Sequence, residues 1–82
     1  MKKVELFYSP VCPHCPHARE LLREYKAANP SFEYDEVDTY TPEGVDRGMS
    51  LNVMAVPSVV VGDVIKLVGW PFSAEDISKA IQ

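Results

Sequence analysis

Residues 7–16 read FYSPVCPHCP, and within this stretch Cys12 and Cys15 form a Cys-x-x-Cys pair. The apolar and aromatic run that leads into the pair, from Val4 to Tyr8, predicts a short β-strand. An amphipathic helix is predicted after the pair, because four residues recur at the spacing of one buried helical face: Ala18, Leu21, Leu22 and Tyr25. The two cysteines therefore stand where a strand gives way to a helix.

Two further elements follow this helix. The acidic run over residues 32–37 predicts a second strand, and its charges favour a place at the edge of the sheet. Thr41, Pro42 and Glu43 supply the N-cap, the first-turn proline and the first-turn acid of a short helix. A strand–helix–strand unit predicts that the first two strands are parallel, with a right-handed crossover.

A hairpin and a last helix complete the predicted fold. Two valine-rich runs, 58–61 and 64–68, flank the two-residue turn Gly62-Asp63. Ser73 followed by Asp76 is a capping signature that predicts the start of the last helix. The order βαβαββα predicts an α/β fold with a four-stranded mixed sheet flanked by three helices, in a single domain over residues 1–82.

Composition narrows the possible functions. The net charge of −4 argues against nucleic-acid binding, which requires a basic surface. No apolar run approaches the roughly 18 residues of a membrane span, and no signal peptide is evident. We therefore expect a cytoplasmic monomer. Met49 and Met54 are expected to fill the core, and Glu5 is expected to lie on the surface and aid solubility.

The cysteine pair is poorly suited to a structural role. A disulfide that closes so small a loop removes little entropy from the unfolded chain, and close cysteine pairs in a reducing cytosol are more often catalytic. If Cys12 is the helix N-cap, its sulfur can accept from the amides of His14 and Cys15, and the helix dipole favours the thiolate. Pro13 would then occupy the first helical position, and Pro16 would stand near the fourth.

These positions predict different roles for the two sulfurs. Cys12 is expected to attack a target disulfide, and Cys15, one turn into the helix and less exposed, is expected to resolve the mixed disulfide. The redox group is the Cys12–Cys15 disulfide itself, so no bound cofactor is expected. His14, between the cysteines, is expected to tune the redox potential together with Pro13.

A rival hypothesis is a binding module for zinc or copper that uses Cys12, Cys15, His14 and His17 as ligands. A closed tetrahedral site usually draws its ligands from two separate segments, and the sequence offers no second cluster. The rings of Pro13 and Pro16 also restrict the loop. The redox interpretation is therefore preferred, and His17 is expected to be a solvated surface residue.

Residues 7–16, together with Val56-Pro57 before the third strand and Gly69 after the fourth, resemble the thioredoxin/glutaredoxin superfamily. The likeness is greatest to the small redoxins of archaea and thermophilic bacteria. It implies a thiol–disulfide oxidoreductase that acts on protein substrates, with a cis Val56-Pro57 peptide facing the cysteines. A cis bond there would leave the Val56 backbone open to pair with an extended substrate, and Gly69 and Trp70 would contact the substrate at the rim.

Departures from the family pattern also carry predictions. Glutaredoxins bind glutathione with a polar pair after a Gly-Gly that follows the last strand, whereas this sequence has Gly69 followed by Trp70, Pro71 and Phe72. By resemblance to redoxins that feed ribonucleotide reductase, we expect the reductant to be a thioredoxin-reductase-like flavoenzyme. Thioredoxins also keep a buried aspartate six residues before the first cysteine, and that position here is Leu6.

Overall fold

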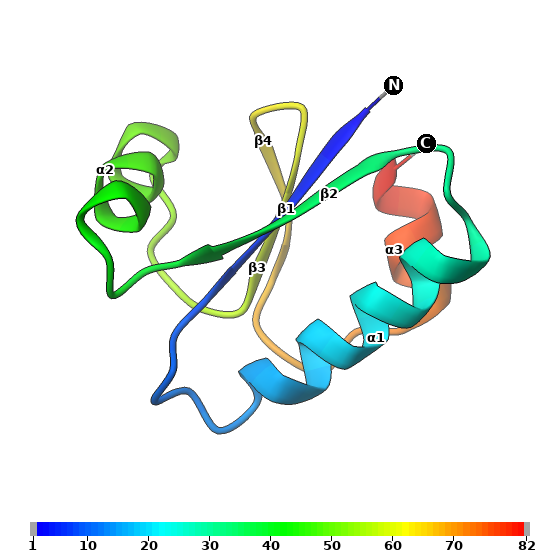
Figure 1. Cartoon of the computed structure of the whole chain (residues 1–82), viewed down its shortest axis with the longest axis horizontal. Helices are drawn as coiled ribbons and strands as arrows, with labels where there is room; N and C mark the ends of the chain where they lie inside the picture. Colours follow the sequence, from blue (N-terminus) through cyan, green and yellow to red (C-terminus); the bar gives the residue numbers. More distant parts are fainter. Residues whose placement is uncertain (1, 82) are drawn as a thin grey trace.

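The computed structural model describes residues 2–81, within which the elements follow the predicted order βαβαββα (Figure 1). Their bounds are β1 (Lys3–Tyr8), α1 (Cys15–Ala28), β2 (Glu33–Asp38), α2 (Pro42–Leu51), β3 (Ser58–Val61), β4 (Val64–Val68) and α3 (Ala74–Ile81). Residues 1 and 82, the ends of the predicted domain, lie outside the described residues, so those bounds stay a prediction. Between residues 2 and 81 no helix is long and apolar enough to cross a membrane.

The four strands form one mixed sheet in the order β2-β1-β3-β4. β1 runs parallel to β2, with Leu6 opposite Glu36, and antiparallel to β3, with Leu6 opposite Val59. β4 pairs antiparallel with β3 and forms the second edge. The acidic strand β2 is therefore an edge strand, as its charges predicted, and the fold class is the one expected from the order of the elements.

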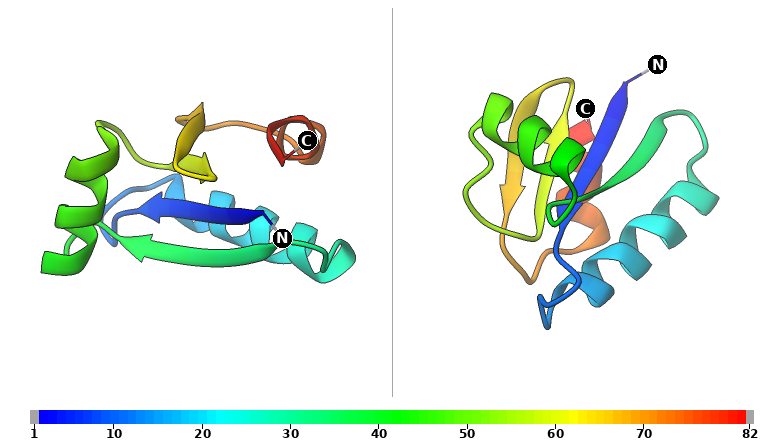
Figure 2. Two further views of the ribbon diagram at one scale, coloured as in Figure 1. Left: turned by 90° about the horizontal axis from the view of Figure 1, so that it is seen from above. Right: turned by 60° about the vertical axis from the view of Figure 1, so that its left-hand side comes forward.

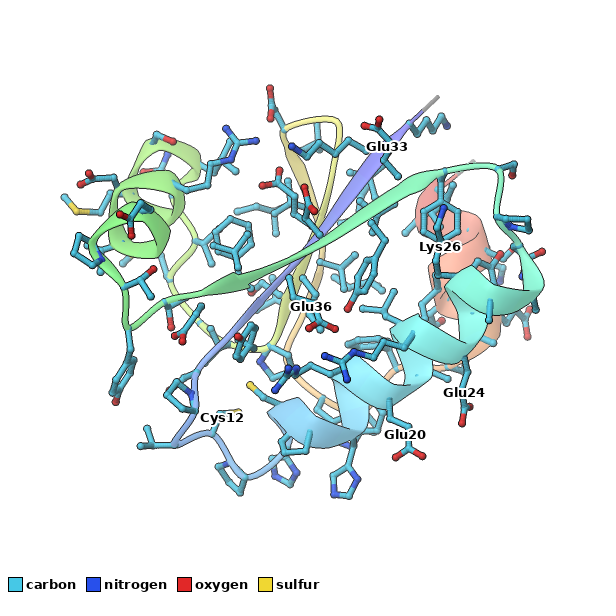
Figure 3. The ribbon with its side chains drawn as sticks, viewed as in Figure 1. Cys12, Glu20, Glu24, Lys26, Glu33 and Glu36 are labelled. Atoms are coloured by element: carbon cyan, nitrogen blue, oxygen red, sulfur yellow. The ribbon has the colours of Figure 1, made fainter. Side chains whose placement is uncertain are left out.

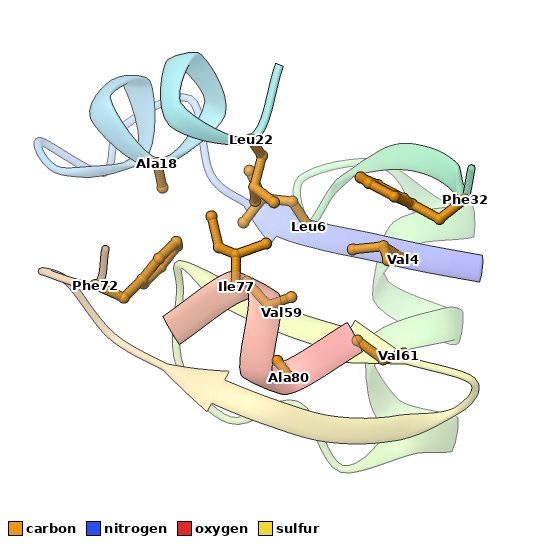
Figure 4. Packing of buried hydrophobic residues seen from close by; sticks show 10 residues of the cluster. All are labelled: Val4, Leu6, Ala18, Leu22, Phe32, Val59, Val61, Phe72, Ile77 and Ala80. Carbon is orange, nitrogen blue, oxygen red and sulfur yellow. The ribbon is translucent and has the colours of Figure 1, made fainter. Parts of the chain in front are cut away.

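The sheet is covered unequally on its two faces. Figures 1 and 2 show α1 and α3 together on one face and α2 on the other. The main core lies under α1 and α3, and Figure 4 shows its members converging from both helices and the sheet. Its buried residues are Val4, Leu6, Ala18, Leu22, Phe32, Val59, Val61, Phe72, Ile77 and Ala80.

Local turn and capping signals formed as the sequence predicted. Gly62 and Asp63 have φ of 55° and 67°, the two left-handed residues of a type I′ hairpin turn. Thr41 caps α2 by accepting from the Gly44 amide. Ser73 and Asp76 form a reciprocal capping box, in which the Ser73 amide donates to the Asp76 carboxylate at 2.9 Å and the Asp76 amide donates to Ser73 Oγ at 3.2 Å.

The α2 face of the sheet departs from what the sequence predicted. Glu5 is buried instead of solvated, and its carboxylate accepts from the Arg47 guanidinium of α2 at 2.7 Å. The same guanidinium donates to Asp63 in the hairpin turn at 2.6 Å, so one arginine ties α2 to both β1 and the hairpin. Met49 and Met54, expected in the core, are 71% and 91% exposed. Both lie outside the region covered by α1 and α3.

Two glycines of α2 stand in different environments. A Cβ at Gly44 would lie 1.7 Å from the Asp38 carbonyl oxygen, so the first turn of α2 touches the end of β2 backbone to backbone. A Cβ at Gly48 would meet the Phe7 ring at 3.8 Å, which is ordinary van der Waals contact. Gly44 is therefore required by close approach, and Gly48 is not.

Alanine substitutions should separate the two positions. Gly44→Ala should destabilise the fold by about 2 kcal/mol or more, because backbone must move. Gly48→Ala should stabilise it by roughly 0.5–1 kcal/mol, because alanine has the higher helix propensity. Urea unfolding of the two reduced variants, compared at constant m-value, measures both effects. Equal changes in the two variants would contradict the close packing of α2 on the end of β2.

Candidate active site

The loop from β1 to α1 places the cysteines differently from the sequence-based expectation. The helix begins at Cys15 and its N-cap is His14, whose side chain makes no capping hydrogen bond. A turn at Ser9 accounts for the later start. Ser9 Oγ accepts from the Val11 amide at 3.2 Å, and the Ser9 carbonyl accepts from the Cys12 amide at 3.1 Å.

The prediction that Cys12 caps the helix is therefore wrong, because α1 begins at Cys15 and His14 occupies the N-cap position. Pro13 is correspondingly in the loop before the helix and not at the first helical position. Pro16 lies within the first two helical residues, where the missing N–H removes no intrahelical hydrogen bond. Pro16, expected near the fourth helical position, thus stands where proline is common in helices.

The two thiols have unequal environments. Cys12 is half-buried and Cys15 is 1% exposed, and both are free. Burial, and after it hydrogen bonding with the Cys12 thiol, raise the pKa of Cys15 to about 11. A backbone hydrogen bond with Ser9 and the charge of Arg19 oppose this rise. Cys15 is therefore a protonated thiol at neutral pH, shielded behind Cys12.

The predicted cis peptide and the glycine after β4 lie together beside the cysteines. The Val56-Pro57 bond is cis, and the Cys12 thiol points at the Val56 carbonyl with a sulfur–oxygen distance of 3.9 Å. The Pro57 carbonyl accepts from the Gly69 amide at 2.7 Å, and Gly69 has φ of 82°, a conformation that glycine adopts without strain. The backbone thus joins Cys12, Val56-Pro57 and Gly69 in one site.

Trp70 lies at the edge of this site. Its half-buried ring packs edge-on against Phe72, with centroids 5.1 Å apart, and stacks on His17 at 6.1 Å. Trp70 therefore combines a core contact with an exposed flank. The Trp70-Pro71 bond is also cis, which the sequence did not predict.

A groove of about 400 Å³ opens beside Cys12, between the Ser9 turn and the segment that precedes Pro57. Val11, Tyr40 and Met54 line it and are 69%, 64% and 91% exposed. These residues were not predicted as site residues from the sequence, and Met54 was expected in the core. These three residues come from separate loops, so no local periodicity could have found them.

The metal-binding hypothesis receives no support from the geometry. Within residues 2–81, no three His, Cys, Asp or Glu side chains come close enough together to hold a metal ion. His14 and His17 are both exposed, and His17 stacks on Trp70 instead of facing the cysteines.

A mixed sheet with a Cys-x-x-Cys pair at the start of the first helix, facing a cis-proline, defines the class of thioredoxin-like dithiol proteins. The chain matches the family model described as "Thioredoxin domain" over residues 2–82 and belongs to that family. It is accordingly a thiol–disulfide oxidoreductase with the redox pair Cys12 and Cys15.

Archaeal relatives match along nearly the whole chain. A thioredoxin of Methanocaldococcus jannaschii is 33% identical over 81 residues, covering 98% of this chain and 92% of the relative. A probable thioredoxin of Methanothermobacter thermautotrophicus is 32% identical over 79 residues, covering 95% and 89%. These proteins are small thioredoxins of nearly the same length.

Solved structures show the same fold. Thioredoxin O2 of Arabidopsis thaliana in its oxidised state superimposes with a TM-score of 0.81 at 22% identity, covering 99% of this chain and 72% of that chain. Thioredoxin 1 of the thermophilic eubacterium Thermosipho africanus gives a TM-score of 0.74 at 18% identity, covering 96% and 89%.

Alkylation should distinguish the two thiols. At pH 7.5 fewer than about one molecule in a thousand carries the Cys15 thiolate, given its pKa of about 11. Iodoacetamide should therefore modify Cys12 and spare Cys15, as measured by peptide mapping of the reduced, folded protein. In urea both thiols should react at similar rates. Comparable modification of Cys15 in the folded protein would refute its shielding.

Proposed function

We propose that this protein reduces or exchanges disulfides in protein substrates, with Cys12 as the nucleophile and Cys15 as the resolving thiol. The observation that carries the proposal is the difference in burial between the two sulfurs. Cys12 lines an open groove, whereas Cys15 is 1% exposed and holds its proton at neutral pH. A bulky disulfide can reach Cys12 but not Cys15.

The reaction proceeds by two exchange steps. The Cys12 thiolate attacks one sulfur of the substrate disulfide, and the other substrate sulfur leaves with the electron pair and takes up a proton. The Cys15 thiol loses its proton and attacks Cys12 Sγ, which releases the second substrate thiol. Two electrons and two protons pass to the substrate, and the Cys12–Cys15 disulfide is formed.

The groove and the cis-proline segment form the substrate-binding surface of this proposal. Val11, Tyr40 and Met54 offer apolar contacts beside Cys12, and burying them against a substrate removes apolar surface from water. The Val56 carbonyl, which accepts from the Cys12 thiol, becomes free for a substrate amide once Cys12 has reacted. Gly69 and the exposed flank of Trp70 border the same surface.

In this proposal Pro13 and His14 adjust the redox potential of the Cys12–Cys15 pair. Both are exposed in the loop between the two sulfurs, and His14 occupies the N-cap of α1. The positive charge of a protonated His14 would stabilise the Cys12 thiolate in the reduced form. The disulfide carries no negative charge, so the oxidised form gains no such stabilisation. Pro13 stiffens the loop, since its ring restricts φ.

Turnover with insulin tests the assigned roles. The dithiothreitol-reduced protein should reduce insulin disulfides catalytically, as followed by precipitation of the insulin B chain. Cys12→Ser should fall to background, because the attacking thiolate is lost. Cys15→Ser should consume one equivalent of substrate and stop. Equal residual turnover in the two variants would contradict the roles assigned to Cys12 and Cys15.

The proposed reductant is a thioredoxin-reductase-like flavoenzyme. The segment after β4 carries Trp70 packed on Phe72 where glutaredoxins hold a polar pair. The N-terminus of α3 is already capped from within, because Ser73 and Asp76 satisfy each other's amides. Neither feature offers the free polar groups that a glutathione carboxylate would need.

Glutathione should therefore be a poor electron donor. In a coupled assay with a glutathione mixed disulfide, turnover should stay far below that of an authentic glutaredoxin run in parallel. A thioredoxin reductase with NADPH should support insulin reduction by the same preparation. Rapid glutathione-dependent turnover would show that the segment after β4 does not exclude this donor.

A further inference from the structure

Arg19 lies one helical turn after Cys15 on α1, so the two side chains share a face of the helix. The Arg19 guanidinium carbon stands 4.4 Å from the centroid of the Tyr8 ring, at the end of β1. Its side chain is 33% exposed. Arg19 therefore lies across the β1–α1 junction, the place where Cys15 is buried, and does not extend into solvent.

Glu36 on β2 holds Arg19 in this place. Its carboxylate accepts from Arg19 at 3.2 Å, from Arg23 at 2.7 Å and from the Tyr34 hydroxyl at 2.9 Å. Figure 3 shows Glu36 pointing from β2 toward the N-terminal half of α1, whereas Glu20 and Glu24 point away from the sheet. Although burial opposes ionisation, the hydrogen bonds from Arg23 and Tyr34 keep the pKa of Glu36 below its usual value.

Leu6 of β1 carries no ionisable group, so any charge that acts on Cys15 must come from a neighbouring element. Leu6 and Glu36 are partners in the parallel pairing of β1 and β2, so they lie side by side on the sheet. Leu6 is completely buried and apolar, and it offers no group that could assist a proton transfer. The charged pair that lies against the end of β1 comes instead from β2 and α1, as Glu36 and Arg19.

We propose that Arg19, held by Glu36 and Tyr8, is a positioning residue that promotes ionisation of Cys15 in the resolving step. The proposal rests on the proposed function, because it requires Cys12 to attack first. In that step Cys15 gives its proton to water, its electron pair forms the bond to Cys12 Sγ, and the substrate sulfur leaves with the electrons of the broken bond. Glu36 cannot take the proton, because its oxygens are occupied by two guanidinium groups and a phenol.

The groups that act on Cys15 support this role. In the reduced protein burial and the Cys12 thiol oppose ionisation of Cys15, whereas the Ser9 backbone and, to a smaller degree, the charge of Arg19 favour it. When Cys12 is tied up in a mixed disulfide, it no longer carries a thiol, and Arg19 is then the charged side chain that still acts on Cys15. The other titratable side chains near the junction are Tyr8 beneath the guanidinium and Glu36 beyond it, with Arg23 and Tyr34 on the same carboxylate. His14 and His17 are exposed.

Rapid mixing with dithiobis-nitrobenzoate separates the two exchange steps. Attack by Cys12 releases one coloured thiolate in a phase whose rate depends on reagent concentration. Attack by Cys15 on the resulting mixed disulfide releases a second in a concentration-independent phase. Rates of both phases should be recorded from pH 6 to about pH 11, because the pKa of Cys15 in the reduced protein is about 11. Thermal unfolding of each variant should be recorded over the same range.

Arg19→Gln should slow the second phase at pH 7 by roughly three- to tenfold and move its pH midpoint upward by a corresponding amount. The first phase should change little. Arg19→Lys should recover much of the second-phase rate, because it keeps the positive charge. Lys66→Gln, which removes the same charge from the exposed face of β4, is the matched control and should leave both phases unchanged.

Two results would overturn the role of Arg19. A wild-type pH midpoint in Arg19→Gln would show that its charge does not reach Cys15, even if the variant is less stable. An Arg19→Lys variant as slow as Arg19→Gln would show that charge is not the cause. If only one thiolate is released by the wild-type protein, or if Cys12→Ser still shows a first phase, the assignment of Cys12 and Cys15 fails instead.

Discussion

The burial of Cys15 at the point where β1 ends and α1 begins is the constraint on which the rest of the site depends. β1 lies between two other strands of the sheet, and α1 covers one face of that sheet. Cys15, the first residue of α1, therefore has almost no access to solvent. The Ser9 turn holds Cys12 three residues earlier, outside the helix and beside an open groove. One short junction thus makes two chemically identical side chains unequal, and a two-step exchange requires that inequality.

Backbone contacts complete the site around this junction. The Val56 carbonyl faces the Cys12 thiol, and the Gly69 amide binds the Pro57 carbonyl. The segments that precede β3 and follow β4 are thereby brought to the same end of the sheet as the start of α1. Side chains then set the properties of the surface: apolar residues around Cys12, and the charged pair of Arg19 and Glu36 behind Cys15.

Features that depend on local chemistry could be predicted from the sequence. The hairpin at Gly62-Asp63, the cap at Thr41 and the capping box at Ser73 each follow from residues within a few positions of one another. The family resemblance supplied the cis Val56-Pro57 bond. The start of α1 was misplaced because the Ser9 turn, which binds the amides of Val11 and Cys12, keeps Cys12 outside the helix, and the sequence alone does not show that this turn forms. Contacts between distant elements, such as Glu5 with Arg47 and Arg19 with Glu36, have no local signature.

The central claim is that the position of each sulfur at the junction determines its role, and the wild-type protein can test it directly. The reduced protein would be mixed with a model peptide disulfide and quenched in acid within milliseconds, and the trapped mixed disulfide would be mapped by mass spectrometry. The account predicts that the peptide is attached to Cys12, because Cys15 is 1% exposed and protonated. A comparable share of peptide on Cys15 would contradict it.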